Sequence, residues 1–280
     1  YLETLDTGLI LYEKNADEKM YPASLTKIMT AIVVLENVKD LDGETAEYPM
    51  WIQNMLYGTN ASLGGLIVGE ELTIRQLLTS ALVQSGNESA MILAGYVGSG
   101  GMADFMPRDI TTFVEMMNDK AKALGCTGTH FTNPTGLHSD NTYTTARDMA
   151  KIALACHANS TYMQVANTVS YTLPATNLHP ARNISSTNRL LKPGSAYYRG
   201  YAQGMKTGFT TQAGRCFVTF ASQNGRTYGL VILGSNSQNI FREAAELFDW
   251  AFSNPDLQPK AAAPETKKHS LFSFWQNLLG

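Results

Sequence analysis

Hydrophobic residues change their spacing twice along this chain of 280 residues. Two short segments rich in apolar residues, 1–5 and 9–13, stand on either side of the turn residues Asp6-Thr7-Gly8, and this pattern predicts a β-hairpin. From about residue 40 to 200 the apolar positions mostly recur at helical spacing, and short strand-like apolar segments then return before a last amphipathic segment. The predicted helices are residues 73–84, 87–97, 109–124, 145–157 and 238–252, and the predicted later strands are residues 201–206, 215–222 and 227–233.

The order of strand, helix and strand patterns predicts a single sheet that contains both ends of one domain, residues 1–253. An α+β architecture with a helical subdomain inserted at about residues 40–200 accounts for this order. We expect a cleft between the sheet and the helical part, because ligand sites often form where two such parts meet.

Residues 254–280 differ in composition and are predicted to be a linker with an amphipathic tail. Proline and alanine come first, and Lys267-Lys268 then precedes an apolar stripe. Such a stripe is compatible with binding at a membrane surface. An ordinary helix packed on the domain, or a fragment of a truncated second domain, also explains it. The stripe consists of Leu271, Phe272, Phe274, Trp275, Leu278 and Leu279.

Composition and charge argue against several classes of function. The formal net charge is −3 and no basic run occurs, so we expect no nucleic-acid partner. The five histidines and three cysteines lack the spacing of metal ligands, and we expect neither a metal nor a cofactor. Cys126, Cys156 and Cys216 are predicted to be buried apolar residues, although a Cys126–Cys156 pair stays open.

The sequence contains no apolar stretch long enough to cross a membrane and no signal peptide. Its first residue already lies in a predicted strand, so the chain is interpreted as processed or trimmed. The missing signal peptide is therefore no argument against export.

Ser24-Leu25-Thr26-Lys27 is the first candidate for chemistry. It follows Pro22 at the start of an apolar periodic segment, and residues three apart share a helix face. The Lys27 amine is thus predicted to lie near the Ser24 hydroxyl, as a base beside a nucleophile. By itself the pattern also fits a helix cap followed by a solvated lysine.

Two further motifs join Ser24 in a set of three. Lys206-Thr207-Gly208 follows at the end of a predicted strand, and Ser85-Gly86-Asn87 lies between two predicted helices. Ser186 and Ser222 also begin a Ser-x-Asn triplet, but Ser186 is too close to Lys206 and Ser222 lies at a hairpin turn. This set of three motifs, in this order, is typical of penicillin-interacting serine enzymes.

With these motifs the chain resembles the serine D-alanyl-D-alanine carboxypeptidases, low-molecular-mass penicillin-binding proteins of the peptidase S11 type. The resemblance extends over about residues 1–252 and includes the segments 131–137 and 145–149. It implies a β-lactamase/transpeptidase-like fold, with a five-stranded antiparallel sheet, flanking helices and the inserted subdomain. It also implies removal of the terminal D-alanine from peptidoglycan stem peptides outside the cytoplasm, with β-lactam antibiotics as covalent inhibitors.

The resemblance assigns a role to each motif residue. Ser24 is the expected nucleophile, Lys27 its base, and Ser85 the relay of the proton to the leaving amine. Asn87 is expected to bind the substrate amide and hold Lys27. The residues expected to bind the rest of the substrate are Lys206 and Thr207 at its carboxylate, Gly208 beside its backbone, Phe209 through its backbone N–H in the oxyanion hole, and Arg242 near the carboxylate. Some members of the family carry histidine at the position of Phe209.

Two other functions stay open. A class A-like serine β-lactamase shares the acylation residues, but it needs a glutamate in a Glu-x-x-x-Asn loop before Lys-Thr-Gly. The only glutamates between Ser85 and Lys206 are Glu88 and Glu115, and neither has asparagine four residues later. A penicillin-binding sensor that is acylated without turnover would retain every acylation residue. An endopeptidase or transpeptidase of the same superfamily is also open.

Overall fold

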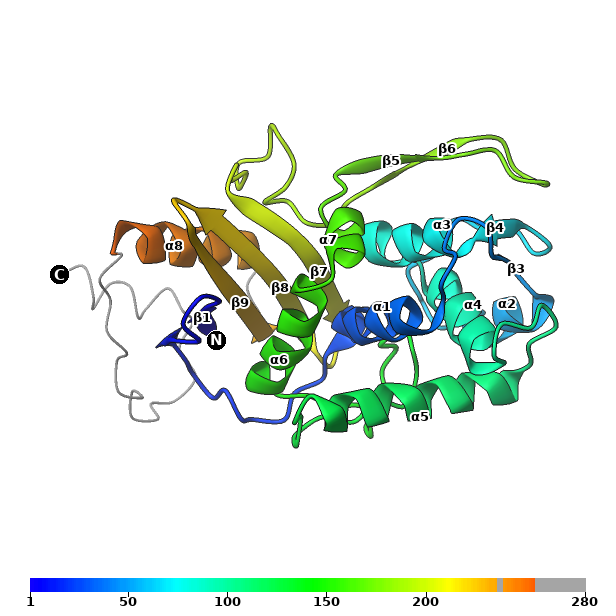
Figure 1. Cartoon of the computed structure of the whole chain (residues 1–280), viewed down its shortest axis with the longest axis horizontal. Helices are drawn as coiled ribbons and strands as arrows, with labels where there is room; N and C mark the ends of the chain where they lie inside the picture. Colours follow the sequence, from blue (N-terminus) through cyan, green and yellow to red (C-terminus); the bar gives the residue numbers. More distant parts are fainter. Residues whose placement is uncertain (236–238, 255–280) are drawn as a thin grey trace.

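A computed structural model of the chain describes residues 1–235 and 239–254. Its main feature is a five-stranded sheet in the order β2-β1-β9-β8-β7, in which every neighbouring pair is antiparallel (Figure 1). The N-terminal hairpin lies beside the last strand, with Leu2 opposite Leu230. The predicted sheet with both ends of the domain in it is confirmed. Its strands are β1 (Leu2–Thr4), β2 (Ile10–Tyr12), β7 (Ala202–Thr210), β8 (Gly214–Gln223) and β9 (Arg226–Ser235).

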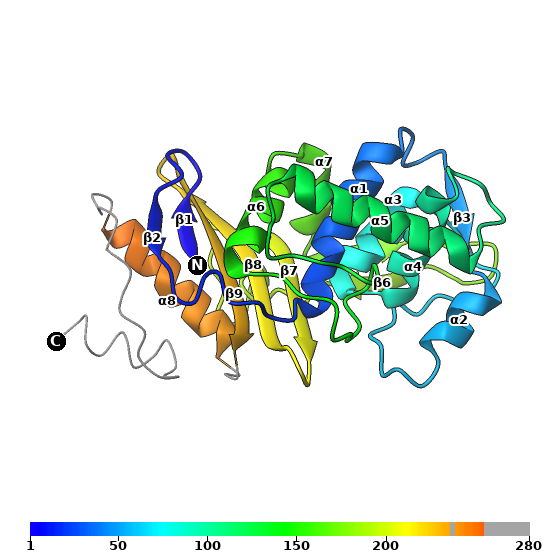
Figure 2. The same ribbon diagram turned by 90° about the horizontal axis from the view of Figure 1, so that it is seen from below.

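Helices cover both faces of this sheet and extend beyond it (Figures 1 and 2). The helices are α1 (Thr26–Asn37), α2 (Met50–Leu56), α3 (Ile74–Thr79), α4 (Asn87–Gly98), α5 (Pro107–Ala123), α6 (Ala146–His157), α7 (Ser160–Ala166) and α8 (Ile240–Ser253). Two short strand pairs complete the described structure: β3 (Thr45–Glu47) with β4 (Glu71–Thr73), and β5 (Ser170–Leu173) with β6 (Arg182–Ser185).

Strand β8 shows how the sequence assigns the two faces of the sheet. Val218 and Phe220 belong to the core that the sheet shares with α1, α6 and α7. Phe217 and Ala221 alternate with them and pack in a second core beneath α8. Side chains of successive strand residues point to opposite faces, so a strand buried on both sides is apolar throughout.

Helices α2 to α5 lie beyond the end of the sheet (Figure 1), where α4 and α5 pack against α1, and α2 and α3 pack against α4. In contrast, α6 packs on β9 and α7 on β7, so the segment 40–200 includes helices that cover the sheet as well as the distant ones. One continuous apolar core extends from Phe113 of α5 to Val231 of β9. The limits of the inserted helical subdomain therefore stay a prediction.

The structure corrects two predicted elements. The helix predicted over residues 73–84 is divided: α3 ends at Thr79, and a π-turn (Ser80–Gln84) leads to Ser85, which has the left-handed conformation (φ 70°). The strand expected to end at Lys206 continues to Thr210. Backbone pairing with β8 continues past Gly208, and this tertiary contact outweighs the tendency of glycine to end a strand.

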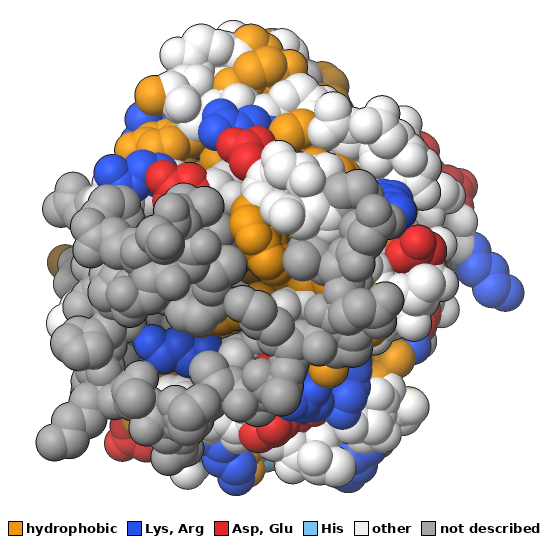
Figure 3. All heavy atoms as spheres, turned by 90° about the vertical axis from the view of Figure 1, so that its left-hand side faces the viewer, with side chains coloured by type: hydrophobic (Ala, Val, Ile, Leu, Met, Phe, Trp, Pro, Cys, Tyr) orange, Lys and Arg blue, Asp and Glu red, His pale blue; other side chains and the backbone are white. Residues whose placement is uncertain are grey.

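The tail at 254–280 lies outside the described residues apart from Asn254. Within the described part no helix has the length and apolar character needed to cross a membrane. At the end of the molecule that carries α8, basic and acidic side chains are interspersed (Figure 3).

All three cysteines are buried and free, as predicted, and no Cys126–Cys156 disulfide forms.

Candidate active site

Ser24 occupies a single 3₁₀ turn, Ala23–Leu25, that leads directly into α1. Two glycines enclose this turn. A Cβ on Gly136 would lie 1.8 Å from the carbonyl oxygen of Ala23, and a Cβ on Gly208 would lie 3.0 Å from the backbone nitrogen of Ser24. The absence of side chains at both positions lets the loop at 133–137 and the edge strand β7 approach the serine from either side.

Lys27 lies one turn after Ser24, and its side chain is almost fully buried. Its Nζ is 3.2 Å from Ser24 Oγ, 2.8 Å from Asn87 Oδ1 and 2.7 Å from the carbonyl oxygen of Thr135. Burial, and then the nearby charge of Lys206, hold the pKa of the Lys27 amine well below its usual value, against a smaller opposing effect of Glu88. Both effects favour the neutral form of the Lys27 amine compared with a solvent-exposed lysine.

Asn87 connects Lys27 to the loop that contains Ser62. Its side chain accepts a hydrogen bond from Lys27 and donates one to the carbonyl oxygen of Ser62, 2.8 Å away. Its backbone N–H donates to the same oxygen. Because Asn87 is the first residue of α4, the start of this helix is anchored at the site.

Ser85 directs its short side chain into the cleft from a left-handed backbone conformation. Within residues 1–235 and 239–254 its hydroxyl makes no hydrogen bond. This conformation allows the chain to turn from the π-turn into α4 within two residues, Ser85 and Gly86.

Strand β7 contributes the third motif at the edge of the sheet. Lys206 is buried, which lowers the pKa of its amine to about 7, and its Nζ donates to the carbonyl oxygen of Thr207 at 2.9 Å. The Thr207 hydroxyl is 2.7 Å from that of Thr187. Phe209, with 60% of its surface exposed, follows on the same strand.

The three motifs meet in one cleft with a volume of about 720 Å³. Ser24, Ser85, Asn87 and residues 207–209 line it, whereas Lys27 and Lys206 are buried behind its wall. Arg242, the last residue singled out from the sequence, is not among the described residues that line the cleft. Its guanidinium lies 3.8 Å from the Glu246 carboxylate, one turn further along α8.

Sequence reasoning missed Arg215, Thr187 and His138, which also line the cleft. Thr187 belongs to the Ser186-Thr187-Asn188 triplet that was set aside, and isolated residues such as Arg215 and His138 carry no motif signal. The chain also contains a literal Ser-Asp-Asn triplet at residues 139–141, and none of its residues lines the cleft.

The segment 131–137, which the resemblance included without a role, forms a turn that is held by the side chain of Asn133. Asn133 Oδ1 accepts hydrogen bonds from the backbone N–H groups of Thr135 (3.1 Å) and Gly136 (2.8 Å), and its Nδ2 donates to the carbonyl oxygen of Leu137. These bonds hold a tight turn in which the Thr135 carbonyl points at Lys27.

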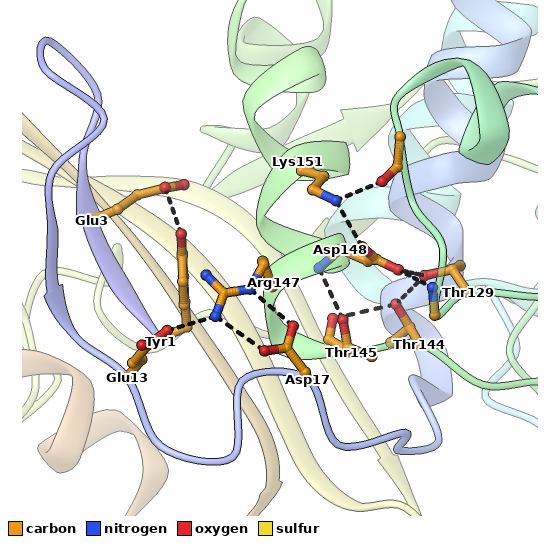
Figure 4. A network of polar contacts seen from close by, with 12 residues as sticks. Tyr1, Glu3, Glu13, Asp17, Thr129, Thr144, Thr145, Arg147, Asp148 and Lys151 are labelled. Carbon is orange, nitrogen blue, oxygen red and sulfur yellow. Dashed lines mark hydrogen bonds and ion pairs between the residues drawn. The ribbon is translucent and has the colours of Figure 1, made fainter. Parts of the chain in front are cut away.

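Arg147 and Asp148, adjacent residues at the start of α6, make separate sets of polar contacts (Figure 4). Asp148 accepts hydrogen bonds from the Gly128 backbone N–H (2.7 Å) and the Thr129 hydroxyl (3.0 Å). Arg147 binds Glu13 and Asp17 of the N-terminal segment instead of its neighbour Asp148. Asp148 therefore supports the loop that leads to residues 131–137, whereas Arg147 fastens the N-terminal segment to α6.

Comparison with known proteins places the chain among peptidases. A family model described as D-alanyl-D-alanine carboxypeptidase, Peptidase_S11, matches residues 2–237. The D-alanyl-D-alanine carboxypeptidase of Streptomyces sp. strain K15 is 34% identical over 88% of this chain and 84% of its own length. The crystal structure of the Streptomyces K15 DD-transpeptidase superposes with a TM-score of 0.81, at 33% identity over 90% of this chain and 95% of that one.

The D-alanyl-D-alanine carboxypeptidase DacF of Bacillus subtilis is 32% identical over 91% of this chain, and the chain spans 61% of that protein's length. The fold is therefore that of the DD-transpeptidase, and the match extends from β1 to the end of the described sheet. From its sheet, its three motifs and these matches, the chain is a member of the D-alanyl-D-alanine carboxypeptidase family, Peptidase_S11.

Proposed function

We propose that this protein is a serine D-Ala-D-Ala carboxypeptidase that releases the terminal D-alanine of peptidoglycan stem peptides through an acyl-enzyme on Ser24. The observation that carries the proposal is the surroundings of Lys27. A neutral amine has two N–H groups and one lone pair. Asn87 Oδ1 and the Thr135 carbonyl can accept only, so they take the two N–H groups. The lone pair is left for the hydroxyl proton of Ser24.

In the first step Ser24 Oγ attacks the carbonyl carbon between the two D-alanines while its proton moves to Lys27. The backbone N–H groups of Ser24 and Phe209 stabilise the oxyanion. Support for this pairing comes from the 3.0 Å that separates a Cβ on Gly208 from the Ser24 nitrogen, and from the position of β7 at the sheet edge.

The C–N bond then breaks, and the leaving amine receives a proton through Ser85. Lys206 and Thr207 bind the terminal carboxylate. Its negative charge favours the protonated form of Lys206, whose pKa lies at about 7 in the unliganded site. Water hydrolyses the acyl-enzyme and restores Ser24. Penicillins acylate the same serine. Position 208 requires glycine, because a Cβ there would crowd the backbone of the Ser24 turn.

Arg242 is proposed as a second contact for the terminal carboxylate. Ile240 and Phe241, the residues before it, line the cleft. A change in the side-chain orientation of Arg242 would be needed to bring its guanidinium to the substrate.

A β-lactamase activity is disfavoured by the position of Glu88. Its carboxylate accepts hydrogen bonds from the backbone N–H groups of Gly64 and Leu66, inside the wall of the cleft. The described lining of the cleft contains no glutamate that could activate a water for deacylation.

We place the reaction outside the cytoplasm, in the periplasm or at the outer face of the membrane, because its substrate is found there. Membrane contact of the tail stays a proposal.

Labelling with a fluorescent penicillin tests the acylation centre. We expect one label per chain in the wild type and none in Ser24→Ala, with D-alanine released from a D-Ala-D-Ala peptide by the wild type alone. A label that survives Ser24→Ala would overturn the proposal. Stable labelling without D-alanine release would favour the sensor, and loss of label within milliseconds would favour the β-lactamase.

Liposome co-sedimentation tests the tail. The full chain and a chain that ends at residue 264 are compared on anionic vesicles. Equal sedimentation of both would contradict membrane contact through residues 265–280.

A further inference from the structure

Glu88 is a buried carboxylate that the proposed reaction does not use. It follows Asn87 in the first turn of α4, and only 1% of its surface is exposed. Among the described residues no lysine or arginine forms an ion pair with it. A buried charge without a counter-ion is costly unless hydrogen bonds compensate it. The groups that donate hydrogen bonds to Glu88 therefore indicate what its burial achieves.

These donors belong to a loop beside the cleft. Oε1 of Glu88 accepts hydrogen bonds from the backbone N–H groups of Gly64 at 2.5 Å and Leu66 at 3.3 Å. Gln84 Nε2 donates to the carbonyl oxygen of Gly64 at 2.7 Å. Glycine is needed here because a Cβ would collide with Ser80 Oγ. The loop is thus fastened both to the π-turn and to α4, and its preceding residues 59–62 line the cleft.

The same loop holds Asn87. The carbonyl oxygen of Ser62 accepts hydrogen bonds from the backbone N–H of Asn87 at 2.9 Å and from its Nδ2 at 2.8 Å. With Nδ2 engaged in this way, Oδ1 of the same amide lies 2.8 Å from Lys27 Nζ. Gly64 lies two residues after Ser62, so the position of Ser62 depends on the bond between Gly64 and Glu88. A chain of contacts therefore leads from Glu88 through this loop to Lys27.

The charge of Glu88 also acts on Lys27. Burial raises the pKa of Glu88, whereas the hydrogen bonds from the loop and the start of α4 favour the ionised carboxylate. Burial and the charge of Lys206 lower the pKa of Lys27, and the negative charge of Glu88 opposes them. Tyr48 faces Glu88 too, but burial and then this charge raise its pKa to about 12, so Tyr48 is neutral in the pH range of the reaction.

We propose that Glu88 is a positioning residue for the acylation of Ser24. Its carboxylate fastens the loop at residues 62–66 to α4, and the loop in turn fixes Asn87 against Lys27. The same carboxylate places a negative charge near the Lys27 amine. This inference rests on the proposed function, which gives Lys27 its role as the base. It adds a residue that acts from behind the wall, since Glu88 is not among the described residues that line the cleft.

Two substitutions separate the contact from the charge. Glu88→Gln keeps an oxygen that can accept from Gly64 and removes the charge, whereas Glu88→Ala removes both. The measurement is the rate of acylation by a fluorescent penicillin from about pH 5 to 10. We expect Glu88→Ala to lose about 10- to 10²-fold at its maximal rate, as for a displacement of about 1 Å at a reacting group. Glu88→Gln should stay within about threefold of the wild type, because the bond to the loop is retained.

The pH profile gives a readout that a purely structural role would not change. The rate falls as the pH drops through the pKa of Lys27, because acylation needs the neutral amine. Loss of the negative charge in Glu88→Gln lowers that pKa, so the acid limb should move to lower pH by about one pH unit. If Glu88→Ala does not fold, this profile decides the question: an acid limb that stays at the wild-type pH in Glu88→Gln would overturn the proposal.

Asp109→Ala is the matched control. Asp109 is also buried at the start of a helix, α5, and its carboxylate accepts the backbone N–H of Met106 at 2.6 Å. This variant should melt at a lower temperature than the wild type and keep both the wild-type rate and the wild-type acid limb. Wild-type acylation by a folded Glu88→Ala protein, or an equal loss of rate in Asp109→Ala, would contradict the positioning role.

Penicillin acylation also separates this proposal from the proposed function. It requires Ser24 and Lys27 but no peptide, so the test stands even if the protein releases no D-alanine. Equal rates and equal pH profiles in the wild type and both Glu88 variants would overturn the positioning role alone. A wild type that penicillin does not acylate would overturn both proposals.

Discussion

Gly136 lies against the carbonyl oxygen of Ala23, the residue before the nucleophile Ser24: a Cβ at position 136 would lie only 1.8 Å from that oxygen. The two residues are 113 positions apart in the chain. Their contact joins the turn that directs the Thr135 carbonyl at Lys27 to the turn that carries Ser24. The relative position of nucleophile and base therefore depends on this contact.

Gly136→Ala is expected to lower the rate of penicillin acylation by about 10²-fold, because a displacement of about 1 Å at a reacting group has this effect. Gly125→Ala is the control, since Gly125 has a similar positive φ (70° against 81°) and open space where a Cβ would be. Both variants lose stability to backbone strain. Equal acylation rates in the two would show that the contact with Ala23 does not position Ser24.

Asn87→Asp is expected to move the acid limb of the pH–rate profile to higher pH. The reaction needs neutral Lys27, so the rate falls as the pH drops through the pKa of Lys27. A carboxylate at 2.8 Å would favour the ammonium form and raise that pKa. The measurement is the acylation rate from about pH 5 to 10. Asn87→Ala removes the hydrogen bond without adding a charge, so it should not move the acid limb to higher pH. An acid limb that stays at the wild-type pH in Asn87→Asp would contradict the base role of Lys27.

Ser85→Gly and Ser85→Ala both remove the hydroxyl, and both are expected to slow D-alanine release by about 10²–10⁴-fold. They differ in backbone strain, because glycine accepts the φ of 70° at no cost and alanine does not. Ser85→Ala should therefore melt at a lower temperature than Ser85→Gly. Wild-type release by a folded Ser85→Gly enzyme would rule out the proton relay.

Lys206→Met is expected to be more stable than the wild type at pH 7 and nearly inactive on peptides. The pKa of Lys206 is lowered to about 7 in the folded state, so between about pH 7 and 10.5 the unfolded chain binds more protons. This group therefore makes the free energy of unfolding rise with pH across that window. Methionine removes the buried charge and with it this part of the pH dependence.

Melting temperatures at about pH 7 and 9.5 measure this effect. The excess stability of Lys206→Met should be larger at the lower pH. The same difference at both pH values would mean that the pKa of Lys206 is not lowered.

The periodicity of apolar residues predicted most of the fold, because it reports burial directly. Short apolar runs in β8 and β9 and helical spacing in α1, α4, α5, α6 and α8 were sufficient to predict these elements and the shared sheet. Strands β3 to β6 and helices α2 and α7 were missed because each has seven residues or fewer, too few for a period to appear; β1 and β2 are as short, but they flank the turn residues Asp6-Thr7-Gly8. The division of the helix predicted at 73–84 depends on the left-handed conformation of Ser85, which no apolar pattern encodes.

The sequence by itself determined which chemical groups are present and their order: a serine with a lysine one turn later, a Ser-x-Asn turn, and Lys-Thr-Gly on a strand. Only the tertiary structure decided the protonation behaviour of these groups and the residues that surround them. Burial lowers the pKa of Lys27, and the Thr135 carbonyl and Asn87 arrive from segments more than fifty residues away. Arg215 lies in the cleft because β8 pairs with β7 in one register. Charge states and distances depend on packing between distant segments, and local sequence carries no record of that packing.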